Sequence, residues 1–321
     1  MATMLSAASP PLQQSPEFAA ALRAIGRPPL PLPDGTLALR RRICGLPVTM
    51  LARSRPCPNA LPDLLKEAGL QNTLLVLSPD DPTRDLAHLG AVPVMSPATL
   101  AELDLTGDLR ANLRGKWRNR LVHAEKQNLR VTRQNMPLDP AHWLFKEATA
   151  QQRQRGYRSW PTDLTLAYAR ENPGQAKLFT AFAGKTPVAA MLFLCHGRAA
   201  TYHIGHTTAR GRHHSAHTLL MWEAMRWLAR KGHHRLDLGL ISTEDAPGLA
   251  RFKLGTGAQA RPLGGTWLWW PRLGKTLRPL AALDARLMQS GWTDTPSVDY
   301  LNTRSYRGKR KPPCSSTPHP Q

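Results

Sequence analysis

The chain has 321 residues, 41% of them hydrophobic, which is long enough for two domains and apolar enough to bury a core. No apolar run approaches the roughly 20 residues that a membrane span needs, so the sequence predicts no integral membrane segment. A formal net charge of +21 favours a polyanionic partner such as a nucleic acid, an anionic membrane or a phosphorylated cofactor. Frequent arginine, alanine, leucine and proline are also typical of proteins from GC-rich genomes, so part of the charge excess has an alternative origin in codon bias.

The cysteines and the N-terminus indicate the compartment. Cys44, Cys57, Cys195 and Cys314 form no CxxC pair, which is typical of reduced, unpaired thiols. The N-terminus lacks the basic start and apolar segment of a secretory signal, so we expect a cytoplasmic protein.

The two ends of the chain are rich in proline. Residues 1–34 contain Pro28, Pro29, Pro31 and Pro33, and their composition predicts an unstructured arm. Residues 296–321 are basic and proline-rich and predict a second disordered tail.

Residues 35–97 carry the pattern of an α/β half-domain that is too small to be stable alone. Short apolar runs occur at Leu37–Ile43 and Val48–Leu51, and we expect a helix at Leu61–Ala68 and strands at Thr73–Leu77 and Ala91–Met95.

Residues 98–295 have the element order of one mixed-sheet α/β domain. A strand at Leu100–Leu105 precedes a basic amphipathic helix over residues 108–128, and helices at Ala141–Gln154 and Thr162–Arg170 follow. A hairpin comes next, and the aromatic run TWLWW at residues 266–270 is the last predicted strand.

The centre of this domain, Ala200–Leu240, reads as one βαβ unit. Alternation over Ala200–Thr207 puts Tyr202 and Ile204 on one side of a strand, and a helix N-capped by Ser215 leads to a second, parallel strand. Units of this kind bind ligands at the carboxyl ends of their strands, where the first turn of the helix can hold an anion. The sequence therefore predicts a site around residues 206–215.

Three segments together resemble the GNAT acyltransferase superfamily, and most closely its FemAB-like and BioF2-like branch. They are GKWRNRLVHAEKQNLRV, the hairpin KTPVAAMLFL with ATYHIGHT, and LLMWEAMRWLARKGHHRLDLG with GLARFKLGTGA. The resemblance implies a mixed, mostly antiparallel sheet flanked by helices, with residues 35–97 as a reduced first GNAT-like lobe.

What the resemblance implies for activity is transfer of an acyl group from acyl-CoA, such as acetyl-CoA, to an amine by direct attack. The FemAB-like alternative uses aminoacyl-tRNA to form a peptide bond, and a third alternative is a non-enzymatic module that binds nucleic acid or an anionic surface. The implied acceptor is a small-molecule or cell-envelope precursor amine.

The superfamily's phosphate-binding loop corresponds here to ARGRHHSA, which assigns cofactor binding to Arg210, Gly211, Arg212 and Ser215. Histidines stand where that loop usually has glycines, which let phosphate oxygens approach the backbone. Arginine and histidine cations are an alternative means of contact with a phosphate.

Three residues are candidates for the chemistry. His206 is the candidate general base, Asp237 would orient an amine or a histidine unless it caps a loop, and Tyr202 would protonate the leaving group unless it is a core aromatic. The cluster of His203, His206, His213, His214 and His217 has no carboxylate or cysteine at ligand spacing, so we predict no metal.

Three further residues are candidates for substrate binding. Trp117 and Arg118 lie on the basic helix, and Lys253 follows the central unit. In the FemAB-like alternative these residues, together with Arg120 of the same helix, would contact phosphates of the donor or of the acceptor. The alternative to substrate binding is that the basic face of the helix is only solvated and that Trp117 is buried in the core.

Overall fold

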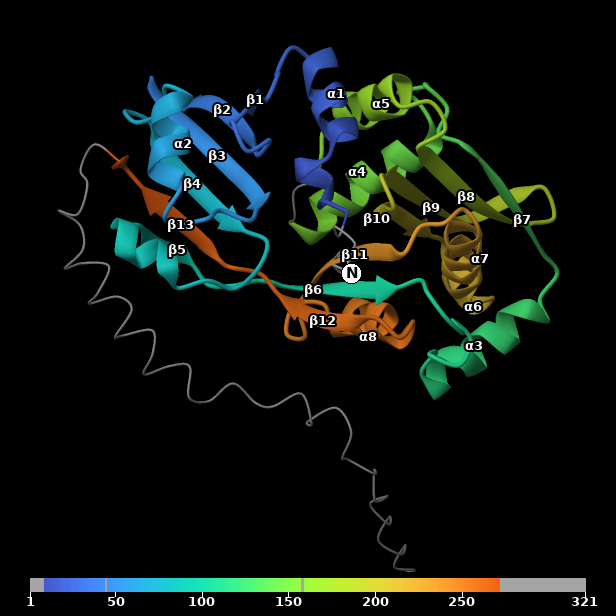
Figure 1. Cartoon of the computed structure of the whole chain (residues 1–321). Coiled ribbons are helices and arrows are strands. Elements are labelled where there is room, and N and C mark those ends of the chain that lie inside the picture. Colours follow the sequence, from blue (N-terminus) through green and yellow to red (C-terminus); the bar gives the residue numbers. More distant parts are fainter. Residues whose placement is uncertain (1–8, 44, 157–158, 272–321) are drawn as a thin grey trace, which may run out of the picture.

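The computed structural model describes residues 9–43, 45–156 and 159–271, and Figure 1 shows their arrangement in two lobes, each built on one sheet. The tail at 296–321 and the stretch 272–295 lie outside the described residues. The predicted class, α/β with mostly antiparallel mixed sheets flanked by helices, is confirmed.

The first lobe contains a six-stranded sheet. Its order is β1 (Leu30–Pro31), β2 (Leu37–Ile43), β3 (Leu46–Ser54), β4 (Leu74–Pro79), β13 (Thr266–Trp269) and β5 (Val92–Met95). β3 and β4 are parallel and are joined through α2 (Leu61–Glu67), whereas the other pairs are antiparallel.

The second lobe contains a seven-stranded sheet. Its order is β12 (Gln259–Pro262), β6 (Thr99–Asp104), β11 (Arg235–Ile241), β10 (Ala199–Thr207), β9 (Thr186–His196), β8 (Ala176–Ala183) and β7 (Leu129–Asn135). β10 and β11 are its parallel pair, joined by α7 (Ala216–Arg230), so the predicted βαβ unit is confirmed.

Helices cover both faces of the second sheet. One buried cluster joins the sheet to α3 (Gly115–Glu125), α7 and α8 (Pro247–Gly255), and the other joins it to α1 (Pro16–Ala24), α4 (Trp143–Arg155) and α5 (Thr162–Glu171). The short helices η1 (Leu12–Gln14), η2 (Asp85–Leu89) and α6 (Ala209–His213) complete the fold. Across the described part of the chain, no helix combines the length and hydropathy required to cross a bilayer.

The boundary between the lobes differs from the sequence prediction at β13. We expected TWLWW to belong to the domain of residues 98–295, but β13 lies between β4 and β5 of the first sheet. Trp267 and Trp269 alternate with Leu268 and enter the core of the first lobe. The half-domain of residues 35–97 is therefore completed by a strand from far along the chain, which supplies the apolar area that it lacks alone.

The prediction of an unstructured arm at residues 1–34 is wrong for the described part, residues 9–34. Ser15 caps α1, accepting a hydrogen bond from the Phe18 backbone N–H, and Phe18 and Leu22 enter the core against α5. Gln14 ties this segment to the first sheet, because its amide donates to the carbonyls of Leu37 and Ala52. The density of prolines hid a short amphipathic helix.

We therefore expect Phe18→Ala to lower the free energy of unfolding by about 3–5 kcal/mol, the usual cost of emptying a buried phenylalanine site. Phe18 is 5% exposed, and its ring lies 4.9 Å from that of Trp160. Arg23→Ala, on the exposed face of the same helix, is the matched control, and denaturant unfolding is the measurement. Equal midpoints for the two variants would show that α1 does not contribute to the core.

A buried ionic network joins the two lobes. Asp80, whose side chain is fully buried, pairs with Arg53 of β3 and with Arg261 of β12, and Arg261 also contacts Glu102 of β6. Arg53 extends the network to Asp237 of β11, with 3.2 Å between the charged atoms. The guanidinium groups therefore fix the carboxyl ends of β3 and β4 in the first sheet against β12, β6 and β11 of the second.

Candidate active site

The two parallel strands β10 and β11 separate within the sheet. They are paired only from Ala199 to Thr201 and from Arg235 to Asp237, and a cavity of about 800 Å³ opens beyond that point. Residues 202–205 and 207 of β10 line one side, and Leu238 and Gly239 of β11 line the other. The facing edges of the strands no longer pair with each other there, so a ligand can lie between them.

A β-bulge sets the direction of the side chains along β10. The register with β9 shifts between Tyr202 and Ile204, so the residues that follow have the opposite alternation to the one that the sequence predicts. Tyr202 packs toward the α7 side, 5.6 Å from the ring of Phe193, and its hydroxyl lies where a side chain at Gly205 would be. Ile204 belongs to the cluster on the opposite face.

His206 lies on that opposite face and is not among the residues that line the cavity, so its predicted place is wrong. Its Nε2 is 3.6 Å from the Glu147 carboxylate of α4, and its ring is perpendicular to Trp143. The inverted alternation after the bulge explains the error.

Two other histidines face the cavity. His203, the bulged residue, shares a hydrogen bond of 2.9 Å with the Thr165 hydroxyl, and His217 of α7 donates 2.8 Å to the carbonyl of His206. Burial lowers the pKa of each imidazole to about 4, so both rings are neutral near pH 7. Neutral rings with such low pKa values are weak bases and suit hydrogen bonding better than proton removal.

Lys253 of α8 is the buried cation of the cavity. It is 5% exposed, and its Nζ donates 2.8 Å to the carbonyl of Leu240 at the end of β11. Burial lowers the pKa of the ammonium to about 8, although the nearby Asp237 carboxylate acts in the opposite direction. The ammonium thus lies where β10 and β11 have parted.

The segment predicted as a phosphate-binding loop forms α6. The Thr208 hydroxyl caps this helix by accepting from the Gly211 N–H, and Gly211, Arg212 and Ser215 line the cavity as expected. Arg210 is exposed and is not among the lining residues. A Cβ at Gly211 would clash with the Val188 carbonyl oxygen of β9, so packing of α6 on the sheet accounts for this glycine.

Residues 107–258 match the family model described as an acetyltransferase (GNAT) domain. This range contains the separated strands β10 and β11, the helix α6 and Lys253. This part of the chain belongs to the GNAT superfamily. The matching family is the FemAB-like and BioF2-like branch, as the sequence segments indicated.

Solved structures share the two-lobed fold at low sequence identity. FemX superposes with a TM-score of 0.67 at 13% identity, covering 85% of this chain and 96% of FemX. L-PGS from Bacillus licheniformis gives a TM-score of 0.52 at 13% identity, covering 87% of this chain and 98% of that one. The C-terminal domain of a protein described as a lysylphosphatidylglycerol synthetase, from Agrobacterium fabrum, gives 0.55 at 14% identity, with 86% and 93% covered. A sequence search among curated proteins found no match.

Asp237 of the GNAT domain does not line the cavity either. Its carboxylate pairs with Arg53 of the first lobe and accepts a 2.7 Å hydrogen bond from the Gly239 N–H. Gly239 has a φ of 78°, and the bond holds this left-handed turn where β11 borders the cavity. The alternative interpretation, a carboxylate that caps a neighbouring turn, therefore matches the geometry.

Trp117 and Arg118 of α3 also lie away from the cavity of the GNAT domain. Trp117 is 4% exposed and packs against Phe252 and Gly255, while Arg118 donates to the carbonyls of Ala111 and Leu113. The α3 residue that lines the cavity is Arg120. The predicted helix start was too early, because residues 108–114 form turns rather than helix.

Sequence reasoning missed several lining residues of the GNAT domain. Gln151 and Gln152 of α4 and Phe252 of α8 have no motif signal, whereas Arg120 was among the basic residues of its helix that the sequence predicted as phosphate contacts. The only sequence feature that could have indicated them is the pair of adjacent glutamines, Gln151 and Gln152, on a predicted helix. Among the described residues, no cluster of histidine, cysteine, aspartate or glutamate has the geometry to hold a metal ion.

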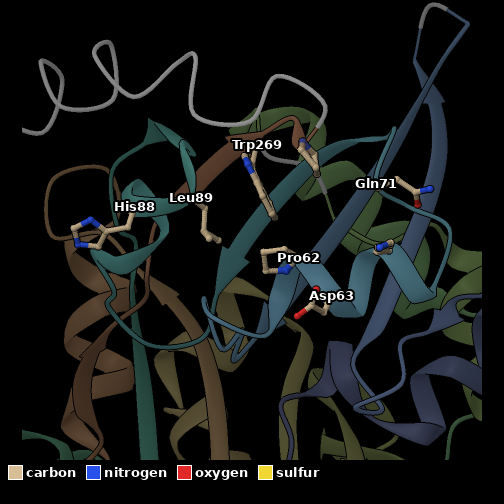
Figure 2. A pocket seen from close by; sticks show the side chains of 8 residues that line it. Pro62, Asp63, Gln71, His88, Leu89 and Trp269 are labelled. Carbon is tan, nitrogen blue, oxygen red and sulfur yellow. The ribbon is translucent and has the colours of Figure 1, made fainter.

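A second, smaller cavity of about 420 Å³ lies in the first lobe, over α2, η2 and β13. Figure 2 shows Trp269 close to Pro62 and Leu89 in its wall. Asp63, Gln71 and His88 lie around it, but nothing there resembles the strand separation of the larger cavity.

Proposed function

We propose that the protein transfers an acyl group from an acyl-CoA to an amine by direct attack in the cavity between β10 and β11. The separation of these strands beside Lys253 is the observation that carries the proposal. A pantetheine arm is linear and carries amides, so it can pair with the exposed edge of a strand as an added peptide strand does.

Each group of the site has a role in this reaction. The amine attacks the carbonyl carbon of the thioester, the carbonyl oxygen becomes an oxyanion, and the C–S bond then breaks to release a thiol. Lys253 donates a hydrogen bond to the oxyanion. Tyr202 supplies the proton to the leaving thiolate, and the proton that the attacking nitrogen loses returns to the Tyr202 oxygen, so that the products are the amide and the free thiol. Arg120 and Arg212, which both line the cavity, bind phosphates of the donor.

Aminoacyl-tRNA is the second candidate donor, because a basic surface borders the same cavity. His214 of the α6 segment hydrogen-bonds Gln127 at the end of α3 at 2.8 Å, which joins the two helices. This surface consists of exposed cations on α3 and α6: Arg114, Lys116, Arg118, Arg120, Lys126, Arg210 and Arg212. With this donor the leaving group is a ribose oxygen, and the product is a peptide bond to the acceptor amine. We propose a small-molecule or cell-envelope precursor amine as the acceptor for either donor, and a cytoplasmic location.

The two donors differ in how salt affects their binding. RNA affinity falls with a log–log slope of about −0.7 for each phosphate neutralised on a single strand, whereas the few phosphates of CoA give a shallow dependence. We expect acyl-CoA to remain bound at physiological salt. Binding of acyl-CoA and charged tRNA at low and physiological salt is the test, and retention of tRNA alone would favour the second donor.

Arginine variants sharpen this test. We expect the double variant Arg120→Gln, Arg212→Gln to weaken acyl-CoA binding more than about tenfold, since a hydrogen bond to a charged group is worth about 1.5–3 kcal/mol. Arg210→Gln is the control, because Arg210 lies outside the cavity wall, and it should change CoA affinity little. A tRNA donor would be weakened by all three substitutions. Unchanged CoA affinity in the double variant would contradict the assignment of the phosphates to these side chains.

A further inference from the structure

The β2–β3 hairpin of the first lobe carries two exposed aliphatic side chains near its end. Ile43 and Leu46 face each other across the strands and are 55% and 57% exposed. Pro47, beside Leu46, is exposed as well. Figure 1 shows that the turn between β2 and β3 points away from the second lobe. This cross-strand pair packs into neither core, and the exposure of its apolar surface to water is unfavourable.

Three consecutive arginines, Arg40 to Arg42, lie directly behind this pair on β2. All three are exposed, and none takes part in an ion pair among the described residues. Between Asp34 and Asp63 the sequence contains no acidic residue. The hairpin therefore carries positive charge that no nearby acidic residue neutralises, and its outermost described side chains are apolar.

The spacing of these groups matches the layers of a bilayer leaflet. A strand rises about 3.4 Å per residue, so the arginines lie about 3–10 Å behind Ile43. The headgroup layer of one leaflet is about 5–8 Å thick, which follows from a hydrocarbon core of about 30 Å in a bilayer of about 40–45 Å. Aliphatic groups at the depth of the acyl chains would thus place guanidinium groups among lipid phosphates.

We propose that the β2–β3 hairpin attaches the protein to an anionic lipid bilayer, with Ile43 and Leu46 inserted among the acyl chains and Arg40–Arg42 bound to headgroup phosphates. Nucleic acid would also attract the arginines, but its phosphate backbone offers no apolar layer for the exposed aliphatic pair. The hairpin lies apart from the cavity between β10 and β11, so this inference stands or falls separately from the proposed transfer reaction.

The test is co-sedimentation of the full chain with vesicles of phosphatidylcholine, with and without phosphatidylglycerol. We expect binding to the anionic vesicles alone. Replacing Arg40, Arg41 and Arg42 by glutamine should weaken it on the order of 100-fold, because each arginine near an anionic surface contributes about fivefold. Ile43→Ser with Leu46→Ser should weaken it at least about tenfold at unchanged net charge.

A charge-matched variant separates the hairpin from the general basicity of the chain. Lys146, Arg170 and Lys185 are exposed cations of the second lobe, and their replacement by glutamine removes the same charge. This variant should lose far less affinity than the hairpin triple variant, and circular dichroism should show native folding in all variants, since the tip residues are exposed.

Two outcomes would overturn the proposal. Equal losses in the two triple variants would mean that only net charge attracts the vesicles. Retained vesicle binding by the Ile43, Leu46 variant, together with loss of binding to single-stranded RNA in the arginine variant, would identify the hairpin as a nucleic-acid contact instead.

Discussion

Replacing Lys253 by methionine is expected to lower the rate of acyl transfer by at least about 100-fold, the usual effect of removing one donor to an oxyanion. Lys253 is the buried ammonium at the point where β10 and β11 separate, and methionine keeps most of its volume without the charge. Lys185→Met, at the exposed turn between β8 and β9, is the control and should transfer at the wild-type rate. Single-turnover kinetics with saturating donor is the measurement.

The stability of the same variant separates a catalytic role from a structural one. A lysine whose pKa is lowered in the folded state costs stability below about pH 8, and that cost disappears as the pH rises from about 8 toward the unfolded value of about 10.4. At neutral pH we therefore expect Lys253→Met to unfold at the same or a higher temperature than the wild type. A large loss of both activity and stability would mean that the lysine holds the end of β11 rather than acting on the substrate.

The pH profile gives a second view of Lys253. Because the donor must be protonated, the transfer rate should fall as the pH rises past about 8. Lys253→Arg retains a positive charge throughout this range, so the variant should lack this descending limb even though its larger head lowers the rate. If the rate of the Lys253→Arg variant still falls above about pH 8, the group that titrates there is not Lys253.

Asp80→Ala is expected to lower the free energy of unfolding by about 3–5 kcal/mol, because it removes the buried carboxylate on which the largely buried Arg53 and Arg261 guanidinium groups converge and leaves them only their more exposed partners. The Asp80 side chain is fully buried and pairs with Arg53 and Arg261, whereas the neighbouring Asp81 side chain is 52% exposed. Asp81→Ala is therefore the matched control and should cost about 1 kcal/mol or less. Denaturant unfolding of both variants is the measurement, and equal costs would contradict the role of this network.

The pH dependence of stability follows from the same carboxylate. Burial alone would raise the pKa of Asp80, but the Arg53 and Arg261 guanidinium groups outweigh it and hold the pKa below its ordinary value. A depressed pKa contributes stability that is complete above the unfolded pKa of about 3.9 and is lost as the pH falls through the folded pKa. We expect acid unfolding of the wild type to include this loss and Asp80→Asn to show less of it.

The sequence predicted the second lobe well because its signals are local. The helix from Ser215 to Gly232 and the strands on either side have clear periodicities, and these three elements form the βαβ unit that borders the site. The position of Lys253 next to this unit was predicted as a substrate contact, and it lines the cavity.

The errors come from features that periodicity does not contain. A one-residue bulge at His203 inverts the faces of β10, which moves His206 to the α4 side and brings His203 to the cavity. The pairing of Asp237 with Arg53 joins residues that are distant in sequence, and so does the insertion of β13 beside β4. Such contacts depend on tertiary packing, which a single sequence does not specify locally.

The measurement that tests the central claim most directly is single-turnover transfer from a labelled acyl-CoA, and in parallel from a labelled aminoacyl-tRNA, to a panel of amines at physiological salt. We predict that the label passes from the CoA thioester to an amine, with release of free thiol, and that Lys253→Met abolishes this step while Lys185→Met does not. Transfer from the aminoacyl-tRNA alone would contradict the assignment of acyl-CoA as the donor. Transfer from acyl-CoA at the same rate in the Lys253→Met variant would contradict the cavity between β10 and β11 as the active site.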